Sequence, residues 1–180
     1  MILILKVFFL MLPAYFSNMA PVFVKNKFSF LDVPVDFNKS FFGQPIFGRN
    51  KTIRGFLAGI IFSIIIVALQ KLLFQYNFIR EISLINYSQV NIFFLGFLFG
   101  FGALFGDLIK SFFKRRFEII PSDSVKIIDQ LDYVVGSLFF ISIVYIPPVD
   151  IIILVMVVSL ILTIVFNHLA YYFHFRKEKW

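Results

Sequence analysis

The chain has 180 residues, 60% of them hydrophobic and only 15% charged, and this balance excludes a soluble globular domain. It has no cysteine, which excludes disulfides, thiolate zinc sites and cysteine nucleophiles. A net charge of +7 would suit nucleic acid in a soluble protein, but in a membrane protein basic cytoplasmic loops account for it, so we expect no nucleic-acid partner.

Five apolar runs approach the length of about 20 residues that crosses a bilayer. They occupy residues 2–24, 53–74, 90–113, 131–149 and 151–173. We therefore predict a single membrane domain over residues 1–180, an all-α integral membrane protein built as a bundle of five transmembrane helices.

The distribution of basic residues orients this bundle. All Lys and Arg residues except Lys6, Lys71 and Arg80 fall on one side of the five-span arrangement, in or beside loops 25–52 and 114–130 and in the C-terminal tail. Because basic loops stay in the cytoplasm, we predict a multi-pass protein of the cell membrane with its N-terminus outside and its C-terminus cytoplasmic.

The first loop ends in a stretch that could hold an anion. Gly48 and Asn50 tolerate a positive φ, so the backbone can curl there and aim its amides at a ligand. Lys51, Thr52 and Arg54 follow at the start of the second helix, whose N-terminus favours phosphate. The spacing is not that of a P-loop, and a plain basic membrane anchor is the alternative interpretation.

The third span carries two Gly-x-x-x-Gly pairs, Gly96 with Gly100 and Gly102 with Gly106. Small residues at this spacing let helix backbones approach closely. The pairs would allow a homodimer, although they also arise by chance in an apolar run that contains glycine.

Near its end the third span becomes polar. Asp107, Lys110, Ser111 and Lys114 are spaced at i, i+3, i+4 and i+7, so they share one face of a helix. A carboxylate costs about 2.5–3.5 kcal/mol at the centre of a bilayer and less near its surface, so Asp107 is a candidate functional residue.

The start of the fourth span carries further carboxylates, Asp129 and Asp132, which face the same way on a helix. Packed against the third span, they would share one cavity with Asp107. Oxygen ligands without Cys or nearby His suit Mg²⁺, and the neighbouring cations suit a polyphosphate. An interfacial ion pair of Asp107 with Lys110, beside an anchor formed by residues 114–116, is the structural alternative.

Several stretches resemble the CDP-archaeol synthases, a family related to the phosphatidate cytidylyltransferases. The most specific are residues 106–116 (GDLIKSFFKRR) and 129–136 (DQLDYVVG). Weaker similarity covers residues 12–15, 18–21, 34–36 and 51–55. The resemblance implies a five-helix membrane enzyme that uses CTP and Mg²⁺ to convert a membrane lipid phosphate, of the bis-O-geranylgeranylglycerol phosphate type, into a CDP-lipid and pyrophosphate.

The resemblance also implies a role for each residue of the cluster. The expected metal ligands are Asp107, Asp129 and Asp132, which with Lys110 form the catalytic set. The residues expected to bind the nucleotide are Lys51, Thr52, Arg54, Ser111, Lys114, Arg115, Arg116 and Gln130. Loop departures from the family pattern at Arg49, Asn50 and Ser122 leave the carboxylates intact.

Three alternatives remain open from the residues alone. The same chemistry on phosphatidate would give CDP-diacylglycerol, because apolar helix faces do not distinguish isoprenoid from acyl tails. A small ion-coupled transporter would relay cations through the buried acids, and an assembly subunit would bind anionic lipid through its basic loops.

Overall fold

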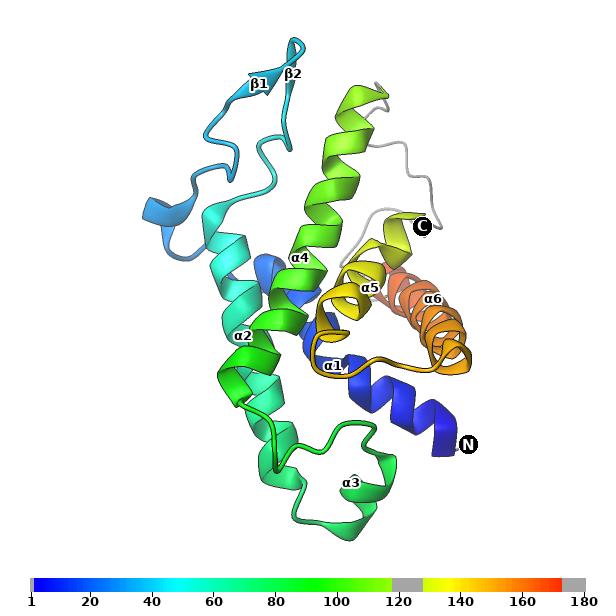
Figure 1. Cartoon of the computed structure of the whole chain (residues 1–180). Coiled ribbons are helices and arrows are strands. Elements are labelled where there is room, and N and C mark those ends of the chain that lie inside the picture. The colour runs from blue at the N-terminus through cyan, green and yellow to red at the C-terminus, as the bar shows by residue number, and fades with distance from the viewer. Residues whose placement is uncertain (1, 118–127, 173–180) are drawn as a thin grey trace.

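The computed structural model of the chain is a bundle of helices with a small β-hairpin beyond one end (Figure 1). It describes residues 2–117 and 128–172, and of residues 128, 129, 167 and 169–171 the backbone alone. The helices are α1 (Ile2–Phe23), α2 (Ile53–Leu73), α3 (Asn77–Ile82), α4 (Ile92–Arg116), α5 (Ile128–Ile141) and α6 (Val149–Tyr172).

Among the described residues, four helices are long and apolar enough to cross a membrane: α1, α2, α4 and the Val149–Phe166 part of α6. They match four of the five predicted spans. The remaining helix, α5, has 14 residues and rises about 21 Å, which is short of a hydrocarbon core of about 30 Å. The count of five crossings therefore stays a prediction.

The fourth predicted span, over about 131–149, contains a shorter helix, because α5 ends at Ile141. The Ser142 hydroxyl donates to the Phe139 carbonyl at 2.6 Å, and the Val144 and Tyr145 amides both bond to Ile141 oxygen at 2.9 Å. Side-chain hydrogen bonds of this kind compete with a regular helix, so turns replace it before the two prolines that precede α6.

Two helices begin where a polar side chain satisfies a backbone amide. Thr52 accepts a hydrogen bond from the Gly55 amide at 3.3 Å and starts α2, and Asn91 accepts one from the Phe94 amide at 3.0 Å and starts α4. These caps fix where the chain leaves the polar loops for the bundle.

Helix α4 packs against α1, α2 and α5, and its glycines make the closest contacts. A Cβ atom on Gly96 would lie 2.6 Å from the Ile64 Cα of α2, and one on Gly102 would lie 2.6 Å from the Gly136 carbonyl of α5. A Cβ on Gly106 would overlap the carbonyl oxygen of Asp132. The two predicted glycine pairs thus serve packing within the chain, and the homodimer stays a prediction.

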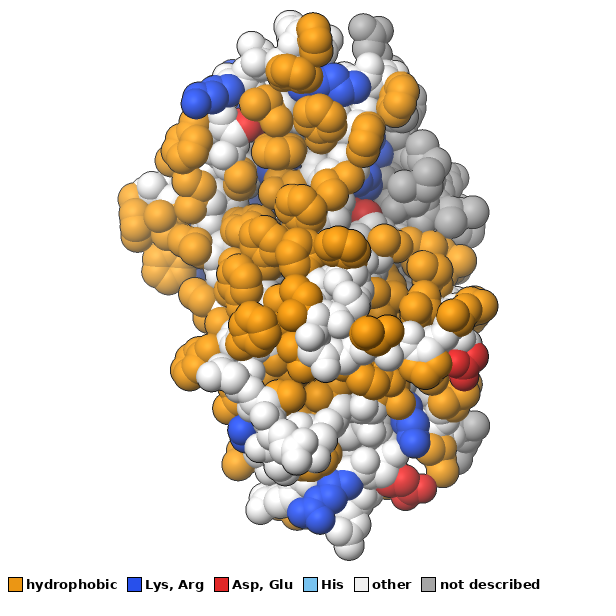
Figure 2. All heavy atoms as spheres, in the orientation of Figure 1, with side chains coloured by type: hydrophobic (Ala, Val, Ile, Leu, Met, Phe, Trp, Pro, Cys, Tyr) orange, Lys and Arg blue, Asp and Glu red, His pale blue; other side chains and the backbone are white. Residues whose placement is uncertain are grey.

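Helix α6 is attached more loosely than the other long helices. It contacts α1 through a hydrogen bond between the Tyr15 and Ser159 hydroxyls at 2.8 Å, and α5 through one between Tyr133 and Thr163 at 3.4 Å. Most of its other side chains are apolar and at least partly exposed. Figure 2 shows hydrophobic side chains gathered over the middle of the visible face, with Lys and Arg toward its ends.

The first loop contains elements that sequence analysis did not identify. A 3₁₀ turn, η1 (Ser29–Leu31), precedes the antiparallel strands β1 (Ser40–Phe41) and β2 (Gln44–Pro45). The Val35 amide bonds to the Lys51 carbonyl at 2.7 Å, so the two ends of the loop lie side by side at the start of α2.

Candidate functional site

Asp107 lies near the C-terminal end of α4 and pairs with two lysines. Lys51 reaches it from the first loop, and the ammonium of Lys110, one turn further along α4, lies 3.0 Å from its other oxygen. Asp107 directly follows Gly106, where the backbones of α4 and α5 are in close contact. The Asp107 carboxylate therefore lies beside α5.

Asp132 contributes the second carboxylate, from the first half of α5. Its side chain is 5% exposed, and its Oδ2 lies 2.5 Å from the Lys110 ammonium. Its Oδ1 accepts a hydrogen bond from the Tyr133 amide at 2.7 Å. Lys110 therefore bridges Asp107 and Asp132, and the structure brings these three sequence-predicted residues into one cluster.

The acidic end of α5 is described only in part. Asp129 lies in the first turn of α5, but its side chain falls outside the described residues, as does most of the predicted second loop. Gln130 is described, and its amide oxygen is buried without a hydrogen-bond partner in that part of the chain.

Asp36 organises the first loop above the cluster. Its carboxylate is nearly buried, and it accepts hydrogen bonds from the amides of Asn38 at 3.0 Å, Phe47 at 2.9 Å and Gly48 at 3.0 Å. Burial favours the neutral acid, but these amide hydrogen bonds outweigh it and lower the pKa of Asp36. The ionised carboxylate thereby fixes the turn that leads to Lys51.

Gly48 is required in this turn for two reasons. Its φ of 92° lies in the left-handed region that side chains disfavour. A Cβ there would lie 2.9 Å from Nη2 of Arg115, so the guanidinium group packs directly on the glycine backbone. The loop and the last turn of α4 are thus fitted to each other.

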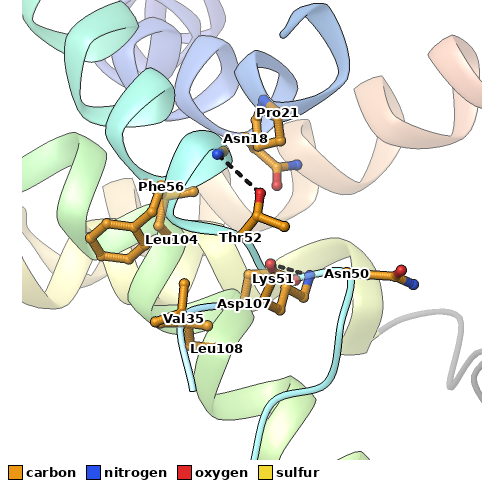
Figure 3. A pocket seen from close by; sticks show the side chains of 11 residues that line it. Asn18, Pro21, Val35, Asn50, Lys51, Thr52, Phe56, Leu104, Asp107 and Leu108 are labelled. Carbon is orange, nitrogen blue, oxygen red and sulfur yellow. Dashed lines mark hydrogen bonds and ion pairs between the residues drawn. The ribbon is translucent and has the colours of Figure 1, made fainter. Parts of the chain in front are cut away.

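Two cavities meet at Lys51. The larger, of about 230 Å³, is strongly basic and is lined by Phe47, Asn50, Lys51, Lys110, Ser111, Lys114 and Arg115. The smaller, of about 150 Å³, mixes polar and apolar walls and is lined by Asn18, Pro21, Val35, Asn50, Lys51, Thr52, Gly55, Phe56, Leu104, Asp107 and Leu108. Figure 3 shows the Lys51–Asp107 pair at one side of the smaller cavity and Asn18 and Pro21 at another.

Two predicted nucleotide-binding arginines lie elsewhere. Arg54 is buried and donates to the Lys27 carbonyl and to Asp32, both at 2.8 Å. Arg116 stacks over the Phe112 ring at 4.5 Å and donates to the Pro45 carbonyl at 3.3 Å. Neither lines the two cavities, and their contacts hold the first loop to α2 and to α4.

Thr52 and Ser111 each line a cavity and also make a hydrogen bond to the backbone. Thr52 caps α2 and lines the smaller cavity, while Ser111 donates to the Asp107 carbonyl at 2.8 Å and lines the basic one. The positions of Asn18 and Phe47 on the cavity walls and the organising role of Asp36 were not predicted from the sequence. The weak similarity at residues 18–21 and 34–36 was the only signal, because the amides that donate to Asp36 follow up to 12 residues later.

The chain is similar to known proteins over its whole length. A family model described as "CarS-like: CDP-archaeol synthase" matches residues 1–180. A CDP-archaeol synthase of Methanococcus maripaludis is 35% identical, with 100% of this chain and 98% of that protein covered. One of Pyrococcus furiosus is 34% identical, with 98% of each covered. A solved structure of an intramembrane enzyme for archaeal membrane lipids biosynthesis superposes with a TM-score of 0.72 at 27% identity, over 88% of this chain and 90% of that one.

Proposed function

The chain belongs to the CDP-archaeol synthase family, and we propose that it transfers the cytidylyl group of CTP to an archaeal lipid phosphate at the Asp107–Lys110–Asp132 cluster. The products are a CDP-lipid, CDP-archaeol, and pyrophosphate. A carboxylate pair from two helices, bridged by a lysine that itself lines a basic cavity, is the observation that supports this site.

The reaction needs no general base. A lipid phosphate monoester has its second pKa near 6, so at neutral pH it is largely a dianion and its oxygen is already a nucleophile. That oxygen attacks the α-phosphorus of CTP, the bond to the oxygen bridging the α- and β-phosphorus breaks, and pyrophosphate leaves. Catalysis then consists of positioning the two anions and neutralising their charge.

The basic cavity suits the triphosphate. Lys51, Lys110, Lys114 and Arg115 bring four cationic side chains to its walls. The Arg115 guanidinium packs against Gly48, whose amide donates a hydrogen bond to Asp36. These cations would bind the phosphates that depart as pyrophosphate and would stabilise the charge that develops on them.

The charges of the cluster itself fit a divalent cation. Asp107 and Asp132 are balanced by Lys51 and Lys110, so the four charges cancel, and an incoming polyphosphate needs further positive charge. Asp107 and Asp132 offer hard oxygen ligands from neighbouring helices, as Mg²⁺ prefers. In the described part of the chain no three acidic or histidine side chains form a metal cluster, and Asp129 is the third ligand we propose. A bound Mg²⁺ held by these carboxylates would supply Lewis-acid neutralisation of phosphate charge.

The smaller cavity suits the polar end of the lipid. It begins at Asp107 and Lys51 and continues between apolar side chains such as Phe56 and Leu104. A phosphate at Lys51 would thus keep its glycerol and tails against apolar walls. The protein is a multi-pass membrane protein. From its basic loops we further propose that this site lies at the cytoplasmic face of the cell membrane, with five crossings and the N-terminus outside.

The test is pyrophosphate release by the purified protein from CTP, Mg²⁺ and a lipid phosphate, with ether and ester lipids compared. Asp132→Asn should reduce the rate by at least about 100-fold, the typical cost of losing transition-state charge stabilisation. Asp150→Asn, which removes an exposed carboxylate at the first turn of α6, is the matched control and should leave the rate unchanged. Full activity of Asp132→Asn, or activity that survives chelation of divalent ions, would contradict the assignment.

A further inference from the structure

The segment 25–33, which directly follows α1, exposes large aromatic side chains beside lysines. Phe28 is 58% exposed and Phe30 is 75% exposed, and their rings contact edge to face with centroids 6.4 Å apart. Lys25 and Lys27 are exposed next to them. Aromatic rings flanked by lysines are typical of the boundary between lipid headgroups and acyl chains.

The backbone of this segment is held in a strained form. Phe28 has a φ of 52°, in the left-handed region that a bulky residue rarely adopts. Arg54 keeps it there, because its guanidinium binds the Lys27 carbonyl before Phe28 and the Asp32 carboxylate after it. Strain that is held in place by a buried arginine, at a residue whose aromatic ring is exposed, indicates a use for that ring.

The depth of the segment follows from its anchor. Arg54 lies in the first turn of α2, just inside the point where the chain enters the bundle. Val22 and Phe23, at the end of α1, are also exposed, so the lipid-facing surface of α1 continues into Phe28 and Phe30.

We propose that segment 25–33 lies in the surface of an anionic bilayer, with Phe28 and Phe30 inserted at the headgroup boundary and Lys25 and Lys27 on acidic headgroups. The contact would hold the first turn of α2 at a fixed depth through Arg54. Lys51, three residues before Arg54, would then be held at the same level as the membrane phosphates.

The hairpin provides an internal contrast. Phe42, at its tip, is 86% exposed, more than Phe30. The hairpin, however, lies beyond the start of α2, beside the C-terminal turns of α4 (Figure 1). Exposure is similar in the two places, and their level along the bundle separates them.

The first experiment uses single tryptophans as depth probes. Full-length protein carrying Trp180→Phe, with either Phe30→Trp or Phe42→Trp, is reconstituted into vesicles whose acyl chains are brominated near the headgroup. Phe30→Trp should show blue-shifted emission quenched about twofold, as expected for an interfacial aromatic, and Phe42→Trp should show neither change. Equal quenching of the two probes, or none at Phe30→Trp, would overturn the proposal.

The second experiment tests the acidic headgroups. Because the chain has no cysteine, Phe30→Cys carries a single spin label. Accessibility to oxygen and to a nickel complex distinguishes labels inserted into the bilayer from labels lifted into water. Adding anionic lipid to a neutral vesicle should raise the inserted-to-lifted ratio by about fivefold for each lysine involved. Lys25→Gln with Lys27→Gln should abolish that increase, and an increase that persists would show that the lysines do not bind headgroups. Neither readout depends on enzymatic activity.

Discussion

The contact between α4 and α5 differs sharply from the contacts of α6. Gly102 and Gly106 bring the backbone of α4 directly against Gly136 and Asp132, with no room for an added methyl group. Helix α6 meets its neighbours through side-chain hydroxyls and exposes many of its apolar residues.

The difference shows where this small bundle needs precision. Asp107 and Asp132 both lie within reach of one ammonium group, and the helices that carry them contact each other backbone to backbone. Helix α6 carries none of the residues that line the two cavities, and an apolar surface that faces lipid needs no fixed partner.

Removing the bridging ammonium group of Lys110 should weaken the contact between α4 and α5 more than any other change. Lys110→Met leaves Asp132 without its ion pair, and breaking a buried pair in this way costs about 3–5 kcal/mol. We expect loss of pyrophosphate release and a marked fall in thermal stability in detergent. Lys71→Met is the control, because Lys71 makes a hydrogen bond to the Val90 carbonyl, away from the cluster. Equal stability of the two variants would show that the bridge does not stabilise the contact.

Adding one carbon atom to each region compares their packing directly. Gly106→Ala places a methyl group on the Asp132 carbonyl and should destabilise the protein by about 1–3 kcal/mol, while also displacing Asp132. Val157→Leu adds one carbon on an exposed face of α6 and should change thermal stability little. A Gly106→Ala protein as stable and as active as Val157→Leu would refute the close contact.

The first loop, which covers the polar end of this contact, should respond to acid. Because the folded protein lowers the pKa of Asp36, the stabilisation from its carboxylate is present above the ordinary pKa of aspartate and is lost as the pH falls through the lowered value. Asp36→Asn turns an amide NH₂ toward backbone donors and should cost about 1–3 kcal/mol at neutral pH. The difference in melting temperature between wild type and Asp36→Asn should therefore shrink in acid, and a constant difference would contradict this role.

The smallest effect is expected at α6. Ser159→Ala and Thr163→Val each remove one hydroxyl contact, which in membrane bundles contributes about 0.6 kcal/mol on average. Both variants should keep their activity and unfold at nearly the same temperature as wild type. A large loss of activity would show that α6 positions the cluster through Tyr133.

The sequence predicted the cluster better than it predicted the helix ends. The i, i+3 spacing of Asp107 and Lys110 places both on one helix face by geometry alone, and the glycines beside them indicated close packing. The end of α5 at Ile141 left no such signal, because the residues that follow are as apolar as the helix itself and one serine turns the backbone.

Lys51 and Arg54 show the limit of reading charges from a sequence. Both are cations at the start of α2, and both were expected to bind nucleotide. Only folding of the first loop decides that Asp32 comes back to Arg54, while Lys51 is left to reach Asp107. The acidic partners that give the two cations different roles lie 22 residues from Arg54 and 56 residues from Lys51 in the sequence. Local sequence patterns carry no information about contacts at that range.

The backbone contact of Gly102 and Gly106 with α5 limits where a lipid molecule can enter the bundle from the bilayer. No hydrocarbon chain passes between two helices whose main chains touch, so this side of the bundle is closed to a lipid molecule. If a lipid phosphate rests at Asp107, as we propose, the rest of that molecule lies toward Pro21 and Phe56, side chains of α1 and α2 that line the smaller cavity.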